Sequence, residues 1–209
     1  MLFDLAQLSP GDGYKLLSAT IVPRPIAWVV SASPEGVLNA APFSFFNLFS
    51  DDPPVVCLGI MGRAAGMKDT STNIKARHEF VVNLVPQRLA QAMNETSVEF
   101  DYGIDELAQV GLTTVPGHLV GVPRIAESPV ALECVPMHYL ELGAGRVIVA
   151  ARVLSVYVDD QAVLDAGKCQ IDTPVLDLIG RMHGRGEYAY TRELFTMLRP
   201  AGKPGSPSS

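Results

Sequence analysis

Residues 63–74 have the composition of an anion-binding site: two cations followed by hydroxyl groups. Arg63 and Lys68 supply positive charge, and a helix is predicted from Asp69 or the next residue, which would cap it, to about Ala76. The hydroxyls come from Thr70, Ser71 and Thr72. The start of a helix adds free N–H groups and the positive end of its dipole. Together these groups can hold a phosphate; the alternative is a solvated helix start with an ordinary capping Asp.

A second segment, residues 39–47, sets small polar side chains among aromatic ones. The polar side chains are Asn39, Ser44 and Asn47, and the aromatic ones are Phe43, Phe45 and Phe46. Such a mixture suits a pocket for a flat, partly polar ligand, and Trp28 from the preceding apolar run can pack nearby. Ordinary core aromatics are the alternative. Neighbouring side chains of an extended segment point to opposite faces, so at most one of the adjacent pair Phe45 and Phe46 is expected to touch the ligand.

Two further groups of residues carry polar chemistry. Arg24 stands between two prolines, which hold it extended, so it either reaches a phosphate or acidic neighbour or forms a surface salt bridge. Near the C-terminus, Arg181, His183 and Tyr188 lie among glycines that allow close approach of the backbone to a ligand. A single histidine in such a place is more often structural than catalytic.

The usual catalytic patterns are missing from the sequence. No Ser/His/Asp arrangement and no pair of carboxylates at a typical spacing is found, so we assign no catalytic residue. The three cysteines and four histidines are scattered without ligand spacing, so we expect neither a metal site nor a disulfide framework.

The pattern of elements predicts a mainly β fold with short inserted helices, a closed antiparallel barrel. Strands are expected at 25–33, 36–41, 55–61 and 79–85, with a long hairpin at 130–141 and 146–158 that turns on Gly143-Ala144-Gly145. Pro42 is expected to end or bend its strand, residues 42–53 to form a loop, and 191–197 to add an edge strand. Helices are expected after Ser9-Pro10 and at 86–95, with a short one ending at Gly111. Residues 1–198 are expected to form one domain, and 199–209 a disordered tail.

Composition limits the partners. The 209 residues carry a net charge of −6 without a basic run, which argues against nucleic acid. No apolar run reaches the roughly 18 residues of a membrane span, and the N-terminus has no basic region typical of a signal peptide, so we expect a cytoplasmic protein. Hydrophobic residues make up 48% and charged residues 18%, which favours an oligomer.

Four ordered motifs resemble the flavin reductase-like family, whose members bind FMN in a split β-barrel. They are the PRPIAWV…APFSFFN…DPP stretch, KDT-x-x-NI at 68–74, PR-x-x-ES-x-x-ALEC at 123–134, and Gly180-Arg181 with Tyr188. The resemblance runs from about residue 13 to 200, and it implies an antiparallel, Greek-key FMN-binding split barrel. It also implies that Asn73 and Ser31 lie near a flavin whose phosphate or ribityl chain is held at residues 63–74. In the family, the element around Arg181 often lies near the flavin, from the same subunit or a partner.

The resemblance leaves three functions open. The first is a homodimeric flavin reductase that takes hydride from NADH or NADPH and passes it to free flavin, a monooxygenase or another redox partner. The second is a flavoredoxin-like electron carrier that is reduced by a protein partner, and the third is a ligand-binding barrel without redox function. No GxGxxG fingerprint follows a strand, so a nicotinamide would have to stack loosely on the flavin. Hydride transfer between cofactors needs no protein nucleophile, which agrees with the empty catalytic set.

Overall fold

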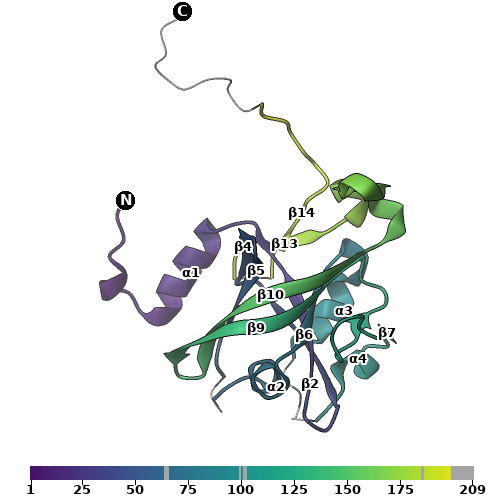
Figure 1. The fold of residues 1–209 in the computed structure, drawn as a ribbon. Coiled ribbons are helices and arrows are strands. Elements are labelled where there is room, and N and C mark those ends of the chain that lie inside the picture. Colours follow the sequence, from purple (N-terminus) through teal and green to yellow (C-terminus); the bar gives the residue numbers. More distant parts are fainter. Residues whose placement is uncertain (64–65, 99, 101–102, 185, 199–209) are drawn as a thin grey trace, which may run out of the picture.

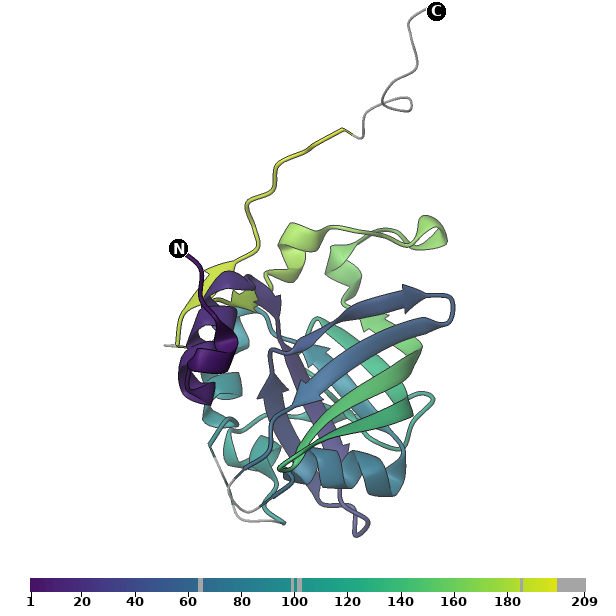
Figure 2. The same ribbon diagram turned by 90° about the vertical axis from the view of Figure 1, so that its left-hand side faces the viewer.

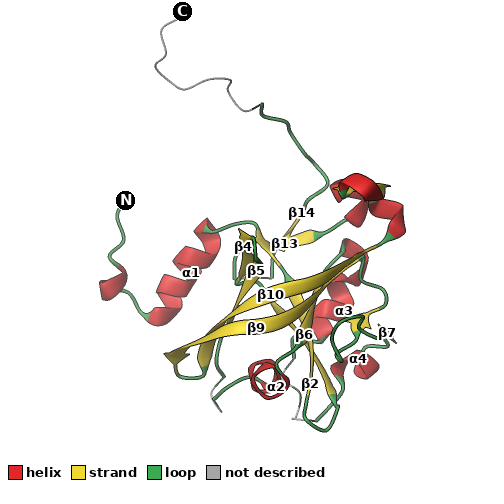
Figure 3. Ribbon diagram, viewed as in Figure 1, coloured by secondary structure: helices red, strands yellow, loops and turns green. Residues whose placement is uncertain are grey.

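A seven-stranded antiparallel sheet, in the order β3-β2-β6-β9-β10-β5-β4, curls into a barrel with helices around it (Figure 1, Figure 3). The computed structural model describes residues 1–63, 66–98, 100, 103–184 and 186–198. The strands of this sheet are β2 (Ala27–Ala32), β3 (Leu38–Phe43), β4 (Phe46–Asp51), β5 (Pro54–Ile60), β6 (Phe80–Leu84), β9 (Val130–Gly143) and β10 (Arg146–Val158).

The barrel closes without a complete ladder. The end strands β3 and β4 follow each other along the chain, and they are not hydrogen-bonded neighbours in the sheet. At the corner between them, the N–H of Gly59 in β5 donates to the carbonyl of Phe45 over 2.7 Å. A Cβ at Gly59 would lie 2.9 Å from the Phe45 Cβ, so this approach requires glycine. The mainly β split barrel predicted from the sequence is therefore confirmed.

Shorter elements surround the barrel. The helices are α1 (Pro10–Thr20), α2 (Asp69–Arg77), α3 (Ala90–Glu95) and α4 (Glu106–Gln109). The short strands are β1 (Arg24–Pro25), β7 (Thr114–Val115), β8 (Arg124–Ile125), β11 (Val163–Asp165), β12 (Gln170–Ile171), β13 (Ile179–Arg181) and β14 (Tyr188–Tyr190). The 3₁₀ turns are Leu5–Gln7, Gln87–Leu89, Asp160–Ala162, Ala166–Lys168 and Thr173–Leu176. Figure 2 shows α1 at one side of the barrel, with α2 across its lower end. Among the described residues, no helix is long and apolar enough to cross a membrane.

The core has two parts because both faces of β2 are covered. Ala27 and Val29 point into the barrel, where they pack with Phe80 and other apolar side chains. Trp28 and Val30 point the opposite way, into a cluster that α3 and α4 cover. This alternation follows from the two-residue period of a strand, and it explains why all six residues of β2 are buried.

The long hairpin holds the segment that precedes α2. β9 and β10 turn on Gly143-Ala144-Gly145 as predicted, and all three residues have positive φ. A Cβ on Gly145 would lie 2.3 Å from the carbonyl oxygen of Gly66, so the turn packs directly on the backbone in front of α2. The hydroxyl of Tyr139 in β9 donates to the carbonyl of Ser71 over 2.7 Å. Both contacts fix the start of α2 against the barrel.

Several boundary predictions are wrong, for identifiable reasons. β3 continues through Pro42, which pairs with Trp28, because β3 is an edge strand where a missing N–H is tolerated. The predicted loop at 42–53 contains β4, which pairs with β5 through a register shift between Leu48 and Ser50. The final strand is β14, and residues 191–197 are not a strand. The predicted disordered tail, 199–209, lies outside the described residues.

Candidate functional site

The start of α2 is open to a ligand. Lys68 occupies the N-cap position, and among the described residues no side chain makes a capping hydrogen bond there, so the prediction that Asp69 or Thr70 caps the helix is wrong. Asp69 is instead the first helical residue, and its carboxylate accepts from the Arg63 guanidinium over 2.6 Å. The first N–H groups of a nine-residue helix and the positive end of its dipole therefore lie beside two cationic side chains.

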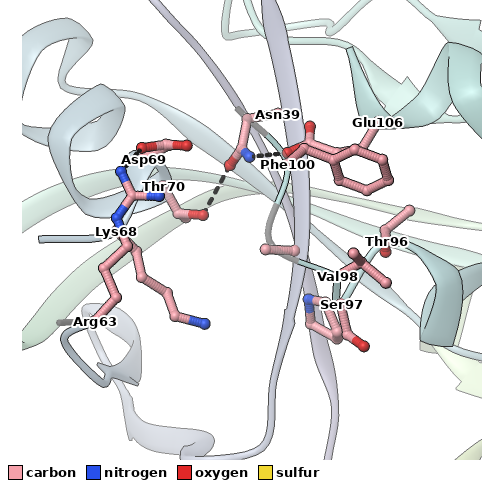
Figure 4. Close-up of a pocket in the computed structure, with 12 residues that line it drawn as sticks. Asn39, Arg63, Lys68, Asp69, Thr70, Thr96, Ser97, Val98, Phe100 and Glu106 are labelled. Carbon is pink, nitrogen blue, oxygen red and sulfur yellow. Dashed lines mark hydrogen bonds and ion pairs between the residues drawn. The ribbon is translucent and has the colours of Figure 1, made fainter. Parts of the chain in front are cut away.

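A cavity that opens to solvent lies at this helix start; its empty space, with the adjoining open solvent included, is about 500 Å³. Figure 4 shows its side chains on two facing sides. One side carries Arg63, Lys68, Asp69 and Thr70, and the other carries Thr96, Ser97, Val98, Phe100 and Glu106. Asn39, Ala41 and Pro42 of β3 line it between them. The structure thus brings together five of the residues predicted from the sequence: Asn39, Arg63, Lys68, Asp69 and Thr70.

Asn39 is the centre of a buried hydrogen-bond network. Its Nδ2 donates to Glu106 Oε1 over 2.6 Å, and its Oδ1 accepts from the hydroxyl of Thr70 over 2.8 Å and from that of Ser31 over 3.3 Å. Behind it, Nδ2 of Asn73 donates to the Ser31 hydroxyl over 3.3 Å. Ser31 is fully buried and Asn73 nearly so, so in this structure they support Asn39 from behind.

Glu106 was not anticipated from the sequence. It is only 6% exposed, and its Oε2 accepts from the N–H of Ala40 over 3.0 Å. Burial, followed by the negative charge of Asp69, raises the pKa of this carboxyl, although the bonds from Ala40 and Asn39 oppose the shift. It belongs to an acidic stretch that gives no signal for an inward-facing member. Thr96 and Phe100 likewise lie outside the sequence motifs described above.

The cations of the cavity are held in defined places. Lys68 Nζ lies 5.6 Å from the centroid of the Phe43 ring, within reach of a cation–π contact. Arg63 Nε is buried and has no hydrogen-bond partner among the described residues, and the same holds for Asn73 Oδ1. An unpaired buried donor costs free energy, so an anion that accepts from Arg63 would stabilise this arrangement.

Trp28 is a core residue and does not line the cavity. Its side chain is completely buried, and its indole Nε1 donates to the hydroxyl of Thr96 over 2.9 Å. The expectation that it packs against a ligand ring is not supported, because protein atoms enclose the indole. Its contact with the cavity is indirect, through the cavity-lining Thr96.

Arg24 joins α1 to β13 instead of lining the cavity. Its Nη1 donates to the carbonyls of Ser18, Ile21 and Met182 over 2.6, 2.9 and 2.7 Å. Its Nε lies 3.4 Å from the hydroxyl of Ser44. At 5% exposure it is no surface salt bridge, and burial lowers its pKa.

Two other predicted residues of 39–47, Phe45 and Asn47, lie just before β4 and at its start. Phe45 is partly exposed and contacts the ring of Tyr14, with the centroids 6.3 Å apart. Asn47 is exposed, and its Oδ1 accepts from the N–H of Leu48. Neither is among the described residues that line the cavity at α2.

Arg181 and His183 lie in and after β13, which pairs with β1 and β14. The Arg181 guanidinium lies 4.7 Å from the centroid of the Tyr188 ring, and His183 forms an ion pair with Glu187. Neither appears in the lining of the cavity at α2 within the described part of this chain. Among all the residues that the structure describes, no three His, Cys, Asp or Glu side chains lie together in a group that could hold a metal ion.

The comparisons with known proteins agree with this geometry. Residues 19–182 match the model of the flavin reductase like domain, and the chain belongs to that family. An uncharacterized protein of Deinococcus radiodurans is 45% identical over 202 residues, which cover 94% of this chain and 88% of the relative.

Two solved structures superpose closely. Nitrilotriacetate monooxygenase component B from Bacillus cereus has a TM-score of 0.89 and 31% identity, covering 94% of this chain and 98% of that chain. The 2-nitrobenzoate 2-nitroreductase NbaA of Pseudomonas fluorescens has a TM-score of 0.89 and 30% identity, covering 99% of this chain and 100% of that chain. The family and these neighbours support a flavin-related redox protein with a split-barrel fold.

Proposed function

We propose that this protein is an FMN-binding reductase that accepts hydride from NADH or NADPH. The observation that carries the proposal is the uncapped start of α2, where Lys68 and Arg63 flank the first N–H groups beside the cavity. Bound FMN supplies the hydride-accepting ring, which explains why the sequence contains no arrangement typical of nucleophilic catalysis.

The residues present fit such a ligand. A phosphate is a strong acceptor, and the site offers it the Lys68 ammonium, the N–H groups of the helix start and the unpaired buried Nε of Arg63. Asn73 Oδ1 is a buried acceptor without a partner in the described residues, but Asn73 lies behind Asn39 and not in the lining of this cavity, so its contribution is to hold Ser31 and Asn39 in place. Thr70 adds a hydroxyl directly on the cavity wall.

The two facing sides of the cavity have different roles. Lys68, Arg63 and Thr70 bind and orient the charged end of the ligand, whereas Val98 and Phe100 on the opposite wall exclude water from it. Asp69 holds the Arg63 guanidinium in place through its 2.6 Å ion pair. Arg24, Arg181 and His183 lie outside this cavity, and we keep them as candidates only for the remaining part of the ligand.

We further propose a homodimer. The exposed apolar side chains include three close together in sequence at the corner of the barrel and on β4, where Leu48 and Phe49 are 66% and 67% exposed and Phe45 is 39% exposed. Exposed patches of this kind are typical of protein interfaces. Sedimentation at micromolar concentration tests this part, and a monomer would contradict it.

The deciding experiment is an anaerobic titration of the FMN-loaded protein with NADH and, in parallel, with NADPH, followed by the flavin absorbance. Rapid bleaching by either nicotinamide is the expected result. A protein that binds FMN tightly but stays oxidised until a reduced protein partner is added would be an electron carrier of the flavoredoxin type instead. A protein that binds no FMN would contradict both.

A further inference from the structure

The hydrogen bonds of Glu106 fix the orientation of the Asn39 amide. Both carboxylate oxygens are occupied: Oε1 by Nδ2 of Asn39 over 2.6 Å, and Oε2 by the N–H of Ala40 over 3.0 Å. An ionised carboxylate only accepts hydrogen bonds. As long as Glu106 is ionised, the amino end of Asn39 must therefore face it, and the carbonyl end must face the other way.

This orientation determines how Thr70 meets the cavity. The carbonyl oxygen of Asn39 accepts from the Thr70 hydroxyl over 2.8 Å, and a hydroxyl has one hydrogen to give. With that hydrogen committed to Asn39, Thr70 offers the cavity only lone pairs. Lone pairs repel a phosphate oxygen, so in the arrangement of this structure Thr70 cannot donate a hydrogen bond to an anion in the cavity.

We propose that Glu106 is a positioning residue that couples phosphate binding in this cavity to the uptake of one proton. The inference rests on the proposed function, since it takes the phosphate of FMN as the anion. A proton from solvent on Oε1 makes this oxygen a donor to Asn39, and the amide reverses. Nδ2 of Asn39 then donates to Thr70, whose hydroxyl hydrogen is released toward a phosphate oxygen. The Ser31 hydroxyl, which donates to Oδ1 of Asn39 in this structure, loses that acceptor and turns away from the amide. Oε2 accepts from Ala40 throughout.

Burial and the charge of Asp69 favour this proton uptake, whereas the cations Arg63 and Lys68 oppose it. Across the cavity lie Asp69, Arg63 and Lys68; Asp69 and Arg63 form an ion pair with each other. The lining residues from β3 and from the end of α3, which include Asn39 and Thr96, carry no charge. A bound phosphate adds negative charge near a carboxyl whose pKa burial already raises, and like charges favour the protonated form.

The link between the protonation of Glu106 and the orientation of Asn39 is testable without any ligand. In the free protein, the side-chain ¹⁵N–¹H signals of Asn39 and the carboxyl ¹³C signal of Glu106 are followed by NMR as the pH is raised. We expect both to titrate with one midpoint, and Glu106→Gln to remove the titration of Asn39, because the glutamine amide donates at every pH. Asp105→Asn is the matched control: it removes the neighbouring charge and keeps a residue able to cap α4. If the Asn39 signals did not shift while Glu106 titrates, the inference would be overturned.

Calorimetry then tests the link to the ligand. FMN and riboflavin are titrated between pH 7 and 8.5, where a phosphate with a pKa near 6 is largely dianionic, in two buffers of different ionisation enthalpy. Up to one proton is expected to be taken up with FMN by the wild-type protein, with up to a tenfold loss of affinity per pH unit. Glu106→Gln should abolish both effects, and riboflavin should show neither. Equal proton uptake by the wild type and Glu106→Gln would refute the coupling. FMN binding no tighter than riboflavin would instead contradict the phosphate site, and the NMR result would still decide the role of Glu106.

Discussion

The indole of Trp28 donates a hydrogen bond to the hydroxyl of Thr96 over 2.9 Å, and this contact joins the core beneath α3 to the wall of the cavity. Both residues are buried, and the Thr96 hydroxyl in turn donates to the carbonyl of Met93 at the end of α3. The position of the cavity wall is therefore tied to the cluster that packs between β2 and the helices α3 and α4.

Replacing Thr96 by Val is predicted to destabilise the protein by about 1–3 kcal/mol, because it leaves a buried indole N–H without an acceptor. Urea unfolding can be followed by tryptophan fluorescence, since Trp28 is the only tryptophan of the chain. Ser97→Ala, at the exposed neighbouring position, serves as the control and should change stability by no more than about 0.5 kcal/mol. Equal unfolding free energies for the two variants would show that the hydrogen bond between Trp28 and Thr96 does not contribute to stability.

The double variant Lys68→Ala with Thr70→Ala is predicted to weaken FMN binding at least tenfold, on the order of 1.4 kcal/mol. Both side chains line the cavity at the start of α2. The matched control is Lys75→Ala with Thr72→Ala, which removes the same side-chain types from exposed positions of the same helix. Quenching of Trp28 fluorescence by FMN gives both affinities, and thermal unfolding shows whether each variant is folded. An unchanged affinity in the first variant would exclude a phosphate at this helix start.

Arg24→Met is predicted to loosen the attachment of α1 to β13. The variant leaves the carbonyls of Ser18, Ile21 and Met182 without their charged donor, and one such bond contributes about 1.5–3 kcal/mol. Hydrogen exchange should accelerate in both elements and leave the β9–β10 hairpin unchanged. Lys15→Met, an exposed cation on the same helix, is the control. If hydrogen exchange in α1 and β13 of Arg24→Met were as slow as in the wild type, the hydrogen bonds of Arg24 would not be needed to attach α1 to β13.

The features that could be predicted from the sequence are those that depend on a local pattern of residues. The β9–β10 hairpin was found because three turn residues separate two long apolar runs, and the start of α2 because cations and hydroxyls cluster there. The cavity residues from Asn39 to Thr70 were found partly through chemistry and partly through the family motifs. Neither source depends on knowing which strands pair.

What the sequence did not show depends on contacts between distant segments. Glu106 is 67 residues from Asn39, and only the packing of α4 on β3 turns one member of an acidic stretch inward. Arg24 was expected at a phosphate or on the surface, but the nearby end of α1 and the distant Met182 surround it with carbonyls. β4 forms because β5 offers it a pairing edge, although its own mixture of aromatic and polar residues resembles a loop.

The last prediction concerns Glu106 and the pH dependence of stability. Burial, and then the charge of Asp69, raises the pKa of this carboxyl in the folded protein above its ordinary value of 4.5. Between 4.5 and the raised pKa, the folded protein keeps a proton that the unfolded chain has released. The contribution of Glu106 to the unfolding free energy is therefore fully present below pH 4.5 and falls as the pH rises from 4.5 to the raised pKa. Above that pKa it is constant.

Glu106→Gln has no such proton to lose. Its unfolding free energy relative to the wild type should rise with pH across this window, by no more than about 1.4 kcal/mol per pH unit, and then level off. Urea unfolding of both proteins at half-unit steps from pH 4.5 to 8 measures the difference, from which the other titrating groups cancel. Asp105→Asn, which leaves Glu106 in place, is the control. A constant difference between Glu106→Gln and the wild type would mean that Glu106 titrates at its ordinary pKa and holds Asn39 in one orientation at every physiological pH.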